Sequence, residues 1–530
     1  MSILLKQVGY VHSDGESLFQ NIDFSIQRKE KAALIGNNGS GKSVLLQILS
    51  GKLIASSGSV VCSSIPYYVP QHFGQYGGVT VAEALRIDKK VESLKRILAG
   101  KGTVNDFVIL DDDWSVEERA VSALSFWGME KISLSCKLNT LSGGEKTSVF
   151  LAGIQIHSPE IILLDEPTNH LDAYNRKRLY DFVCSSSATM VVVSHDRTLL
   201  NLFPITYELE CSVIKCYGGN YEFYRKQKDL EKAALHADLE EQKKEFRLAK
   251  KIAIEVIERK QKQNIRAPKN AKKAGMGKMA MNTMKSKSEK RTSRLEEIHE
   301  DKLNAIIGKV NHIRNLLPDE GLMKTNILSS SLHIGKILVS AQNINWSYSG
   351  EFLWKEPLTF QIKSGDRLSV RGKNGTGKTT LLKLITGVLQ PIGGIIKRAE
   401  FKYLYLDQEY SIVKNTLSVF DQVKHFSSGL SDDMLKIILS RFLFPHDTWN
   451  KDCAVLSGGE KMRLSLCCLM VSENMPDMLI LDEPTNNIDV RNMDILLSAV
   501  RNYKGTILLV SHDEYFVRQV NVGYFIDLDV

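Results

Sequence analysis

Two stretches of the chain have the residue types and spacing of a phosphate-binding loop. Each fits the pattern G-x-x-x-x-G-K-[ST], in which glycines let the backbone N–H groups point at phosphate and the following helix adds partial positive charge. We expect Lys42 and Lys378 to neutralise the β and γ phosphates. The predicted nucleotide-binding residues here are Gly36, Asn37, Asn38, Gly39, Ser40, Gly41, Lys42, Ser43 and Val44, and in the second stretch Gly372, Lys373, Asn374, Gly375, Thr376, Gly377, Lys378, Thr379 and Thr380.

Paired carboxylates follow two later apolar runs. Asp165 and Asp482 end these runs and are expected to hold the shell of a Mg²⁺ ion. Glu166 and Glu483 come directly after them, where a carboxylate can orient and polarise an attacking water. Phosphoryl transfer needs positioning and charge neutralisation more than covalent help, so we predict Glu166 and Glu483 to be catalytic.

Two further polar residue types recur beside this chemistry. His195 and His512 each stand in Ser-His-Asp at the end of a later apolar run, where they could contact the γ-phosphate as catalytic groups. A single histidine at a strand end is more often structural, but both copies place one there. Gln71 and Gln408 could reach Mg²⁺ and water. The predicted metal ligands are Ser43, Gln71, Asp165, Thr379, Gln408 and Asp482.

A second anion-binding pattern opens a helix in each half of the chain. Two glycines at a helix start again expose backbone N–H groups to an anion. Each half therefore has two phosphate-binding surfaces, and its own nucleotide needs one. Two halves placed face to face would let each pattern complete the other's site. The residues are Ser142, Gly143, Gly144 and Glu145, and Ser457, Gly458, Gly459 and Glu460.

The chain is an internal repeat. Residues 32–51 return as 368–387, 140–146 as 455–461, 161–172 as 478–489 and 191–196 as 508–513. Four matched blocks in one order indicate two homologous domains. Within each, an apolar strand, a phosphate loop and a helix predict an α/β core with a parallel sheet. We therefore expect domains at 1–217 and 337–530, with a linker at 218–336.

The first domain is longer than the second in one place. The interval from Gln71 to Leu141 exceeds that from Gln408 to Leu456 by 22 residues. We place the insertion at about 88–113 and interpret it as a short helical excursion. An ordinary surface loop and an arm that contacts a partner remain equally open interpretations.

Bulk properties limit the function classes. The 530 residues are 43% hydrophobic and 25% charged, with a mild net charge of +8 and eight cysteines that form no Cys-x-x-Cys pair. A zinc ribbon, an iron–sulfur cluster and a disulfide framework are therefore not indicated, and a reduced, cytoplasmic setting is expected. No apolar run approaches the length that spans a bilayer, and the first residues lack the features of a signal peptide.

The linker concentrates positive charge. Residues 259–294 hold thirteen Lys or Arg and a single acid, Glu289, which leaves this segment at +12. Apolar residues at four-three spacing on both flanks predict an antiparallel helical hairpin, with the first helix at about 221–263 and a tip at about 266–286. A solvated tether, a disordered Met-rich loop and a probe that touches nucleic acid are the alternatives. The seam residues are Leu235, Leu239, Phe246, Ala249, Ala253, Val256, Leu303, Ile306, Val310, Ile313 and Leu317.

Together these blocks resemble the ATP-binding cassette (ABC) superfamily, over about 410 of the 530 residues. Tandem cassettes, no membrane segment, LSGGE and a charged helical linker resemble its ABC-F branch, as does the sequence Gly218-Gly219-Asn220-Tyr221. The resemblance implies two P-loop nucleotide-binding domains joined by a long antiparallel helical hairpin. It implies an ATPase with ATP and Mg²⁺ as cofactors, and a monomer whose cassettes pair with each other.

The resemblance also implies how the sites are composed and which partner they serve. The Ser-Gly-Gly-Glu segment of each cassette is the family's signature. Site one would join Lys42, Asp165 and Glu166 to the second signature at 457–459. Site two would join Lys378, Asp482 and Glu483 to the first signature at 142–144. The linker would enter the ribosomal exit site and contact 23S rRNA and P-site tRNA near the peptidyl-transferase centre. Some relatives are housekeeping translation factors, and others dislodge antibiotics from the ribosome. The short insertion beside a long linker leans slightly toward the resistance members.

Some positions depart from the family pattern. Val44 stands where threonine is usual, and Ser148 where the second copy has Arg463, the more usual residue. Hydrolysis is expected at both sites, with the first signature the less typical. The adenine-stacking residue is not fixed: His12 and Tyr348 align best, and Tyr10 and Trp346 are alternatives. Two other functions are compatible with the motifs, the ATPase component of a transporter with separate membrane subunits and a DNA-maintenance ATPase; the basic hairpin between complete cassettes favours neither.

Overall fold

The computed structural model describes residues 1–12, 15–210, 213–273, 278–316, 332–348, 350–408, 410–427, 429–472, 475–486 and 488–529. It divides into two units. One holds Met1–Phe223 with Met323–Val530, which carry the repeated motifs, and the other is Tyr224–Leu322. Among the described helices, none is long and apolar enough to cross a membrane.

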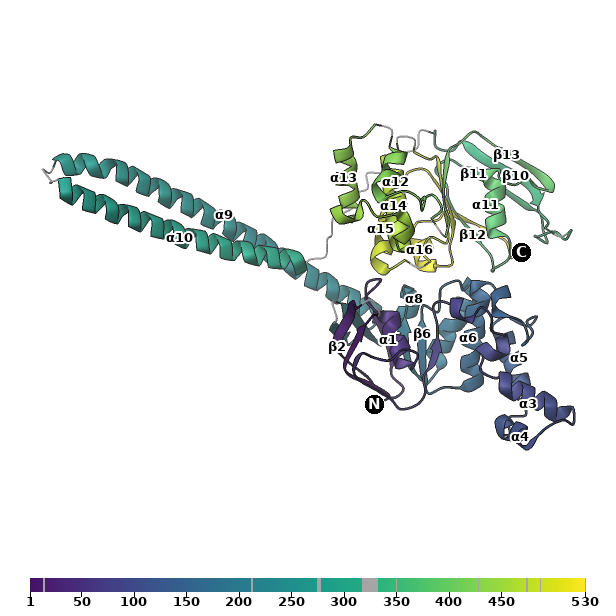
Figure 1. Cartoon of the computed structure of the whole chain (residues 1–530). Coiled ribbons are helices and arrows are strands. Elements are labelled where there is room, and N and C mark those ends of the chain that lie inside the picture. The colour runs from purple at the N-terminus through teal and green to yellow at the C-terminus, as the bar shows by residue number, and fades with distance from the viewer. Residues whose placement is uncertain are drawn as a thin grey trace. The chain divides into compact units, whose positions relative to one another are not determined.

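The first cassette is built on a mostly parallel sheet of six strands in the order β5-β6-β7-β3-β8-β9 (Figure 1). Its central strands β6 and β7 are apolar except for Asp165 and Thr189 and are buried along their whole length, as expected for a parallel sheet covered on both faces. A second, antiparallel sheet has the order β2-β1-β4. The strands are β1 (Ile3–Val11), β2 (Ser17–Ile26), β3 (Lys31–Ile35), β4 (Ser57–Cys62), β5 (Tyr67–Val69), β6 (Ile161–Asp165), β7 (Thr189–Val193), β8 (Ile205–Glu210) and β9 (Val213–Tyr217).

Helices of the first cassette cover this sheet and form the insertion. The segment predicted as a helical excursion at 88–113 contains α3 and α4, which pack on each other. The helices are α1 (Lys42–Leu49), α2 (Val81–Ala84), α3 (Asp88–Leu98), α4 (Val104–Leu110), α5 (Val116–Phe126), α6 (Gly143–His157), α7 (Ala173–Ser185) and α8 (Arg197–Leu200), with short 3-10 turns at Gly74–Tyr76 and Leu138–Thr140.

The second cassette repeats this plan. Its five strands β14-β15-β16-β12-β17 are all parallel, and β11-β10-β13 form the antiparallel sheet. The strands are β10 (Ile337–Asn345), β11 (Leu358–Lys363), β12 (Arg367–Arg371), β13 (Gly393–Arg398), β14 (Tyr403–Leu406), β15 (Met478–Asp482), β16 (Thr506–Val510) and β17 (Tyr524–Asp527). The helices are α11 (Lys378–Thr386), α12 (Val419–Phe426), α13 (Asp432–Arg441), α14 (Gly458–Val471), α15 (Val490–Asn502) and α16 (Glu514–Gln519), with 3-10 turns at His446–Thr448 and Cys453–Val455.

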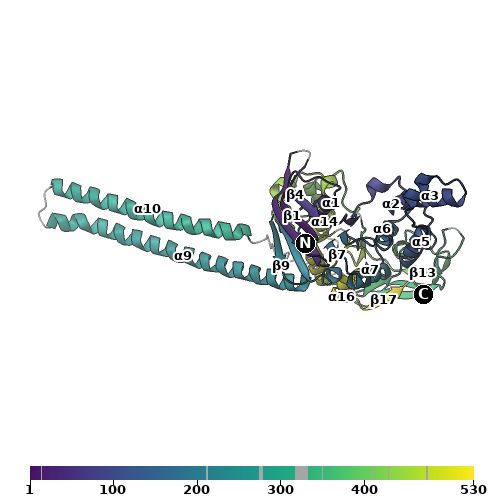
Figure 2. The same ribbon diagram turned by 90° about the horizontal axis from the view of Figure 1, so that it is seen from below.

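The linker is a pair of long helices, α9 (Tyr221–Lys273) and α10 (Lys278–Leu316). They lie side by side in both views of the molecule (Figure 1 and Figure 2). Among the described side chains of this pair, Tyr221, Leu239, Ala253, Ile306 and Ile313 are buried, and the last four of these belong to the predicted seam. The predicted helical hairpin and the two α/β cassettes are therefore confirmed.

The hairpin end differs from the expectation in one respect. The first helix was expected to end near 263, but α9 continues to Lys273 and so passes through Pro268. A proline inside a helix removes one backbone hydrogen bond, and a helix of this length tolerates that local loss. Most of the expected tip at 266–286 is thus helical, while 274–277 and the tip side chains lie outside the described residues.

Candidate nucleotide sites

Both phosphate loops lie between a buried strand and a helix. In the first, Lys42 Nζ donates hydrogen bonds of 2.8 Å to the carbonyl oxygens of Gly36 and Asn37. In the second, Lys378 Nζ donates to the carbonyl of Gly372 at 2.8 Å. Each lysine is thus held across its own loop. Burial lowers the pKa of Lys42, against the attraction of Glu166 and other carboxylates.

Glycine is required where each loop enters its helix. Gly41 has φ of 96° and Gly377 has φ of 90°, in the left-handed region that side chains disfavour. A Cβ at Gly41 would lie 2.8 Å from the ring of Phe19, and one at Gly377 would lie 2.2 Å from Leu353. The sequence pattern therefore reflects both backbone conformation and close packing.

The hydroxyl and carboxylate predicted to share Mg²⁺ meet in the first cassette. Ser43 Oγ donates to Asp165 Oδ1 at 3.0 Å, and Asp165 ends β6 as expected. Tyr68 adds a contact that sequence reasoning missed, because its hydroxyl donates to Asp165 Oδ2 at 2.9 Å. Burial raises the pKa of Asp165.

The second cassette repeats this arrangement. Thr379 Oγ1 donates to Asp482 Oδ2 at 3.4 Å, and Tyr405 OH donates to the same oxygen at 2.7 Å. The two tyrosines stand three residues before Gln71 and Gln408, so their common place in the repeat was the signal that could have identified them.

These groups fit a hard cation. A hydroxyl oxygen and a carboxylate oxygen are ligands that Mg²⁺ prefers, and each cassette brings the two together. Within the described residues, no three or more His, Cys, Asp or Glu are grouped to hold a metal. The protein would therefore supply part of the shell, and nucleotide phosphates and water the rest.

The glutamates after these aspartates are buried and adopt an unusual backbone conformation. Glu166 has φ of 48° and Glu483 has φ of 49°. Non-glycine residues rarely adopt such angles, and they persist where surrounding contacts impose them. Each backbone N–H donates at 2.8 Å to the carbonyl of the last residue of the neighbouring strand, Val193 or Val510. The imposed backbone conformation thus sets the direction in which each glutamate side chain leaves the chain.

Each glutamate faces the histidine predicted to join it. His195 Nε2 lies 3.3 Å from Glu166 Oε1, and His512 Nε2 lies 3.4 Å from Glu483 Oε1. Burial, with the charge of Asp165, raises the pKa of Glu166 to about 8, and burial raises that of Glu483 to about 7. Burial lowers the pKa of His195 to about 3 and that of His512 to about 2. Both imidazoles are therefore neutral at ordinary pH.

The Ser-Gly-Gly-Glu segments begin α6 and α14. Ser142 Oγ accepts from the N–H of Glu145 at 3.3 Å, while the Glu145 carboxylate accepts from the N–H of Ser142 at 2.7 Å. Ser457 and Glu460 form the same reciprocal pair. The two glutamates predicted to bind nucleotide are thus engaged in capping their own helices.

The two cavities at these motifs are built differently. A cavity of about 430 Å³ at the second phosphate loop is lined from both cassettes, with Lys378, Glu483 and His512 on one side and 142–144 on the other. A cavity of about 340 Å³ at Lys42 is lined, among the described residues, by the first cassette alone. The structure therefore brings a signature to site two and does not bring 457–460 to the site one cavity.

Other predicted residues divide between the same two cavities. Gln71 and His12 line the cavity at site one, whereas Gln408 and Tyr348 line that at site two. Tyr348 OH also lies 2.9 Å from Thr380 Oγ1. Of the four aromatic candidates for adenine stacking, His12 and Tyr348 are the ones that line cavities.

The segment between each predicted catalytic glutamate and the next helix was not predicted to contribute. Asn374 Nδ2 in the second phosphate loop donates to the carbonyl of His170 at 2.9 Å, and its backbone N–H donates to Asp172 at 3.5 Å. The repeated sequences NHLD and NNID could have indicated this role.

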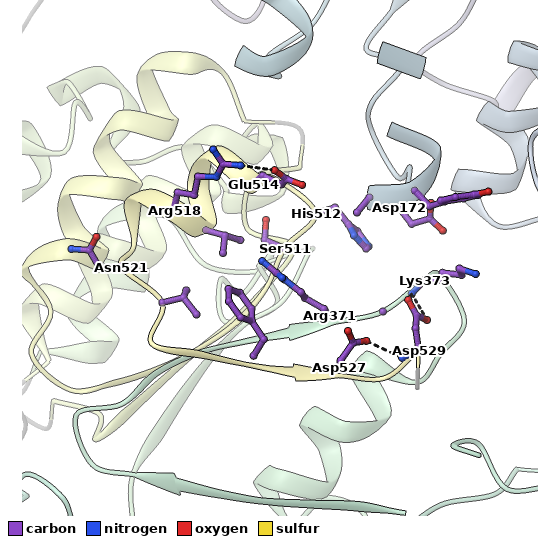
Figure 3. Close-up of a pocket in the computed structure, with 16 residues that line it drawn as sticks. Asp172, Arg371, Lys373, Ser511, His512, Glu514, Arg518, Asn521, Asp527 and Asp529 are labelled. Carbon is purple, nitrogen blue, oxygen red and sulfur yellow. Dashed lines mark hydrogen bonds and ion pairs between the residues drawn. The ribbon is translucent and has the colours of Figure 1, made fainter. Parts of the chain in front are cut away.

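A larger cavity of about 890 Å³ lies beside site two and shares His512 with it (Figure 3). Asp172 reaches toward it from the first cassette, and the N–H of Lys373 donates to Asp529 Oδ1 at 3.0 Å (Figure 3). The second phosphate loop is thus held by Asp529, which follows the last strand of its own cassette.

Comparison with known proteins places these motifs in a family. The ABC transporter family matches residues 19–169 and 356–486. ABC transporter F family member 5 of Arabidopsis thaliana is 28% identical over 96% of this chain and 72% of its own. The uncharacterized ABC transporter ATP-binding protein YfmM of Bacillus subtilis is 27% identical over 98% of this chain and 97% of its own.

Solved structures share the fold. The archaeal ribosome recycling factor aABCE1, in complex with ribosomal stalk protein aP1, superposes with a TM-score of 0.56 at 17% identity over 97% of this chain and 86% of its own. The RNase-L Inhibitor gives a TM-score of 0.57 at 17% identity, over 98% of this chain and 86% of its own. Two matched cassettes, the relatives' family and the cavities at both phosphate loops agree: the chain belongs to the ABC transporter family and is an ATP-binding, ATP-hydrolysing protein of its F branch.

Proposed function

We propose that this ABC-F ATPase acts on the ribosome and that its linker contacts rRNA and P-site tRNA near the peptidyl-transferase centre. The charge of the linker carries the proposal. Residues 259–294 have a net charge of +12, and their described parts, 259–273 and 278–294, belong to two long helices that expose most of their described side chains. Such a concentration of cations at one end of a stiff element suits a phosphate backbone.

The two nucleotide sites would supply the movement. We propose that ATP and Mg²⁺ at site one join Lys42, Asp165 and Glu166 to 457–459, while site two joins Lys378, Asp482 and Glu483 to 142–144. Glu166 and Glu483 orient the attacking water, with His195 and His512 beside the γ-phosphate. Closure on ATP would place the hairpin, and hydrolysis would release it.

Two solved structures of similar fold support the assignment of a partner. One is described as an archaeal ribosome recycling factor with a ribosomal stalk protein, and another as a model of ribosome-bound archaeal Pelota and ABCE1, with a TM-score of 0.53 and 17% identity. Those descriptions concern those proteins. The basic hairpin is the feature of this chain that leads to the same partner.

Co-sedimentation with ribosomes tests the proposal. The chain with both Glu166→Gln and Glu483→Gln should be trapped on ribosomes in the presence of ATP. Changing Lys285, Lys287, Lys290, Arg291 and Arg294 together to alanine should then reduce the bound fraction at least tenfold and lower the salt dependence of binding. Replacing Lys243, Lys244, Arg247, Lys250 and Lys251 removes equal charge elsewhere in the hairpin and should have less effect. Unchanged ribosome binding of the variant with the five alanines between positions 285 and 294 would refute the proposal.

We further propose that the outcome for the cell is protection of the ribosome against antibiotics. The short two-helix insertion at α3 and α4, together with a long hairpin in the same chain, supports this choice over a housekeeping translation factor. Expression in a sensitive host should raise the inhibitory concentration of at least one lincosamide, streptogramin, pleuromutilin, macrolide or phenicol. The variant with both Glu166→Gln and Glu483→Gln should not raise the inhibitory concentration. Equal inhibitory concentrations across the panel would favour the housekeeping function.

A further inference from the structure

Arg176 is a buried cation next to the segment that joins the cassettes. It lies in the first turn of α7, whose N-terminus is capped by Asp172, and it is 6% exposed. Its Nε donates to the carbonyl of Leu171 at 3.1 Å, and Nη1 lies 3.8 Å from Asp196 Oδ2. A buried charge is costly unless carboxylates and hydrogen bonds compensate it, so its position calls for an explanation.

The charge of Arg176 reaches the second cassette. Arg176 lines the cavity of site two together with Lys378, Glu483 and His512. Burial lowers the pKa of the Arg176 guanidinium, but Asp196, Tyr180, Glu483 and Asp513 together raise it above its ordinary value. Glu483 and Asp513 belong to the second cassette. The guanidinium is thus stabilised from both sides of the interface.

The other copy lacks this cation. Each cassette has an aspartate that caps the helix, Asp172 or Asp489, and four residues later the first has Arg176 where the second has Met493. Met493 is 4% exposed and packs in the apolar core of its own cassette. Site one therefore has no counterpart of Arg176 at the matching position.

We propose that Arg176 is a positioning residue of site two alone. Brought from the first cassette, its guanidinium attracts the carboxylate of Glu483 and holds it in the direction needed for the attacking water. Site one operates without such a group, so the two sites hydrolyse ATP at different rates. This inference rests on the composite sites proposed above, but not on the ribosome as partner.

ATP turnover in two single-site backgrounds tests the inference. In Glu166→Gln, where site two is the competent site, Arg176→Met should lower kcat about tenfold and change KM less than threefold. That fall corresponds to about 1.4 kcal/mol. Arg176→Lys keeps the positive charge and should recover kcat to within threefold of its background. Lys177→Met removes a charge from the next, exposed residue of α7 and should leave kcat unchanged.

Several outcomes would overturn the inference. An equal fall in the Glu483→Gln background would show that Arg176 supports folding or closure in general. A rise in KM alone, or no recovery by lysine, would also contradict a positioning role. If both backgrounds are inactive, single-turnover phosphate release is measured on the chain that carries Arg176→Met alone. The inference requires that this change slows one of the two phases of release. Equal slowing of both phases would refute the inference. If Glu483→Gln alone leaves ATP turnover unchanged, the assignment of Glu483 to a hydrolysing site two is refuted.

Discussion

The two nucleotide sites of this chain carry nearly the same residues in different surroundings. Both have a lysine held across its loop, a hydroxyl on an aspartate and a strained glutamate facing a neutral histidine. Site two is lined by both cassettes, includes a signature and has Arg176 close to Glu483. The described lining of site one comes from the first cassette alone. Repetition of a motif thus preserves its internal contacts and leaves its neighbours free to diverge.

The divergence lies where one cassette meets the other. Arg197 of the first cassette donates to Asp494 at 2.6 Å and to Tyr515 at 2.9 Å, both in the second. The position that matches Arg197 in the second copy is Glu514, which pairs with Arg518 of its own helix. The first cassette thus makes a contact with the second that the second does not make in return, and the pair of cassettes is asymmetric. Four experiments test how far this asymmetry extends to the two sites.

The largest effect is expected from the two strained glutamates. Changing Glu166 and Glu483 together to glutamine should lower ATP turnover at least about 100-fold, because a positioned general base contributes on the order of 10² to 10⁴ in rate. The measurement is steady-state phosphate release. Each single change should show how unequally the two sites contribute. Residual turnover above a tenth of the starting rate would mean that these residues are not the bases.

A smaller effect is expected from adding a methyl group to the signature at 142–145, where it contacts the second phosphate loop. A Cβ at Gly144 would lie 2.5 Å from the carbonyl of His170 and 2.8 Å from Asn374 Nδ2. Gly144→Ala should therefore impede site two and lower turnover by roughly tenfold, the equivalent of about 1.4 kcal/mol. Gly78→Ala, with no atom near the added methyl, is the matched control. Equal turnover of the two variants would show that this contact is not needed.

The aromatic residues of the two cavities should affect nucleotide affinity. Loss of base stacking costs on the order of 1 kcal/mol, or about fivefold in affinity. Tyr348→Ala should weaken ATP binding at site two, and His12→Ala should weaken it at site one. Binding of a fluorescent ATP analogue to each variant provides the measurement. A response to Trp346→Ala or Tyr10→Ala instead would transfer the role to those residues.

The smallest effect is expected from the one-directional pair. Arg197 is buried but Asp494 is half exposed, and partly exposed ion pairs contribute on the order of 1 kcal/mol or less. Thermal unfolding of Arg197→Ala, Asp494→Ala and the double variant should give a coupling of that size. Strictly additive single effects would show that the pair does not stabilise the association of the cassettes.

Much of each site was predictable because its determinants are local. The glycine pattern of 36–41 encodes a loop with left-handed residues, and the lysine at its end must follow the next helix wherever that helix lies. Asp165 and Asp482 were located by the apolar strands they end. The seam spacing on both flanks of the linker likewise predicted four side chains that α9 and α10 bury, Leu239, Ala253, Ile306 and Ile313.

Contacts between distant segments were not predictable in the same way. Tyr68 and Tyr405 reach their aspartates because neighbouring parallel strands place them there; the repeat marks the two positions but does not show which side chain each tyrosine contacts. The glutamates of Ser-Gly-Gly-Glu were predicted to bind nucleotide, and this stays a prediction. The structure adds that each caps its own helix, since a carboxylate at the third helical position reaches the N-cap N–H.

The sequence alone therefore determined the repeat, the chemistry of each phosphate loop and the charge of the linker, because these depend on residues close together in the chain. The tertiary structure decided that the two sites differ, since burial raises the pKa of both Glu166 and Glu483, whereas Glu483 also feels the charge of Arg176 from the other cassette. Arg176 illustrates the division. In the sequence it is one arginine in a helix, and in the fold it is a buried charge shared by two cassettes.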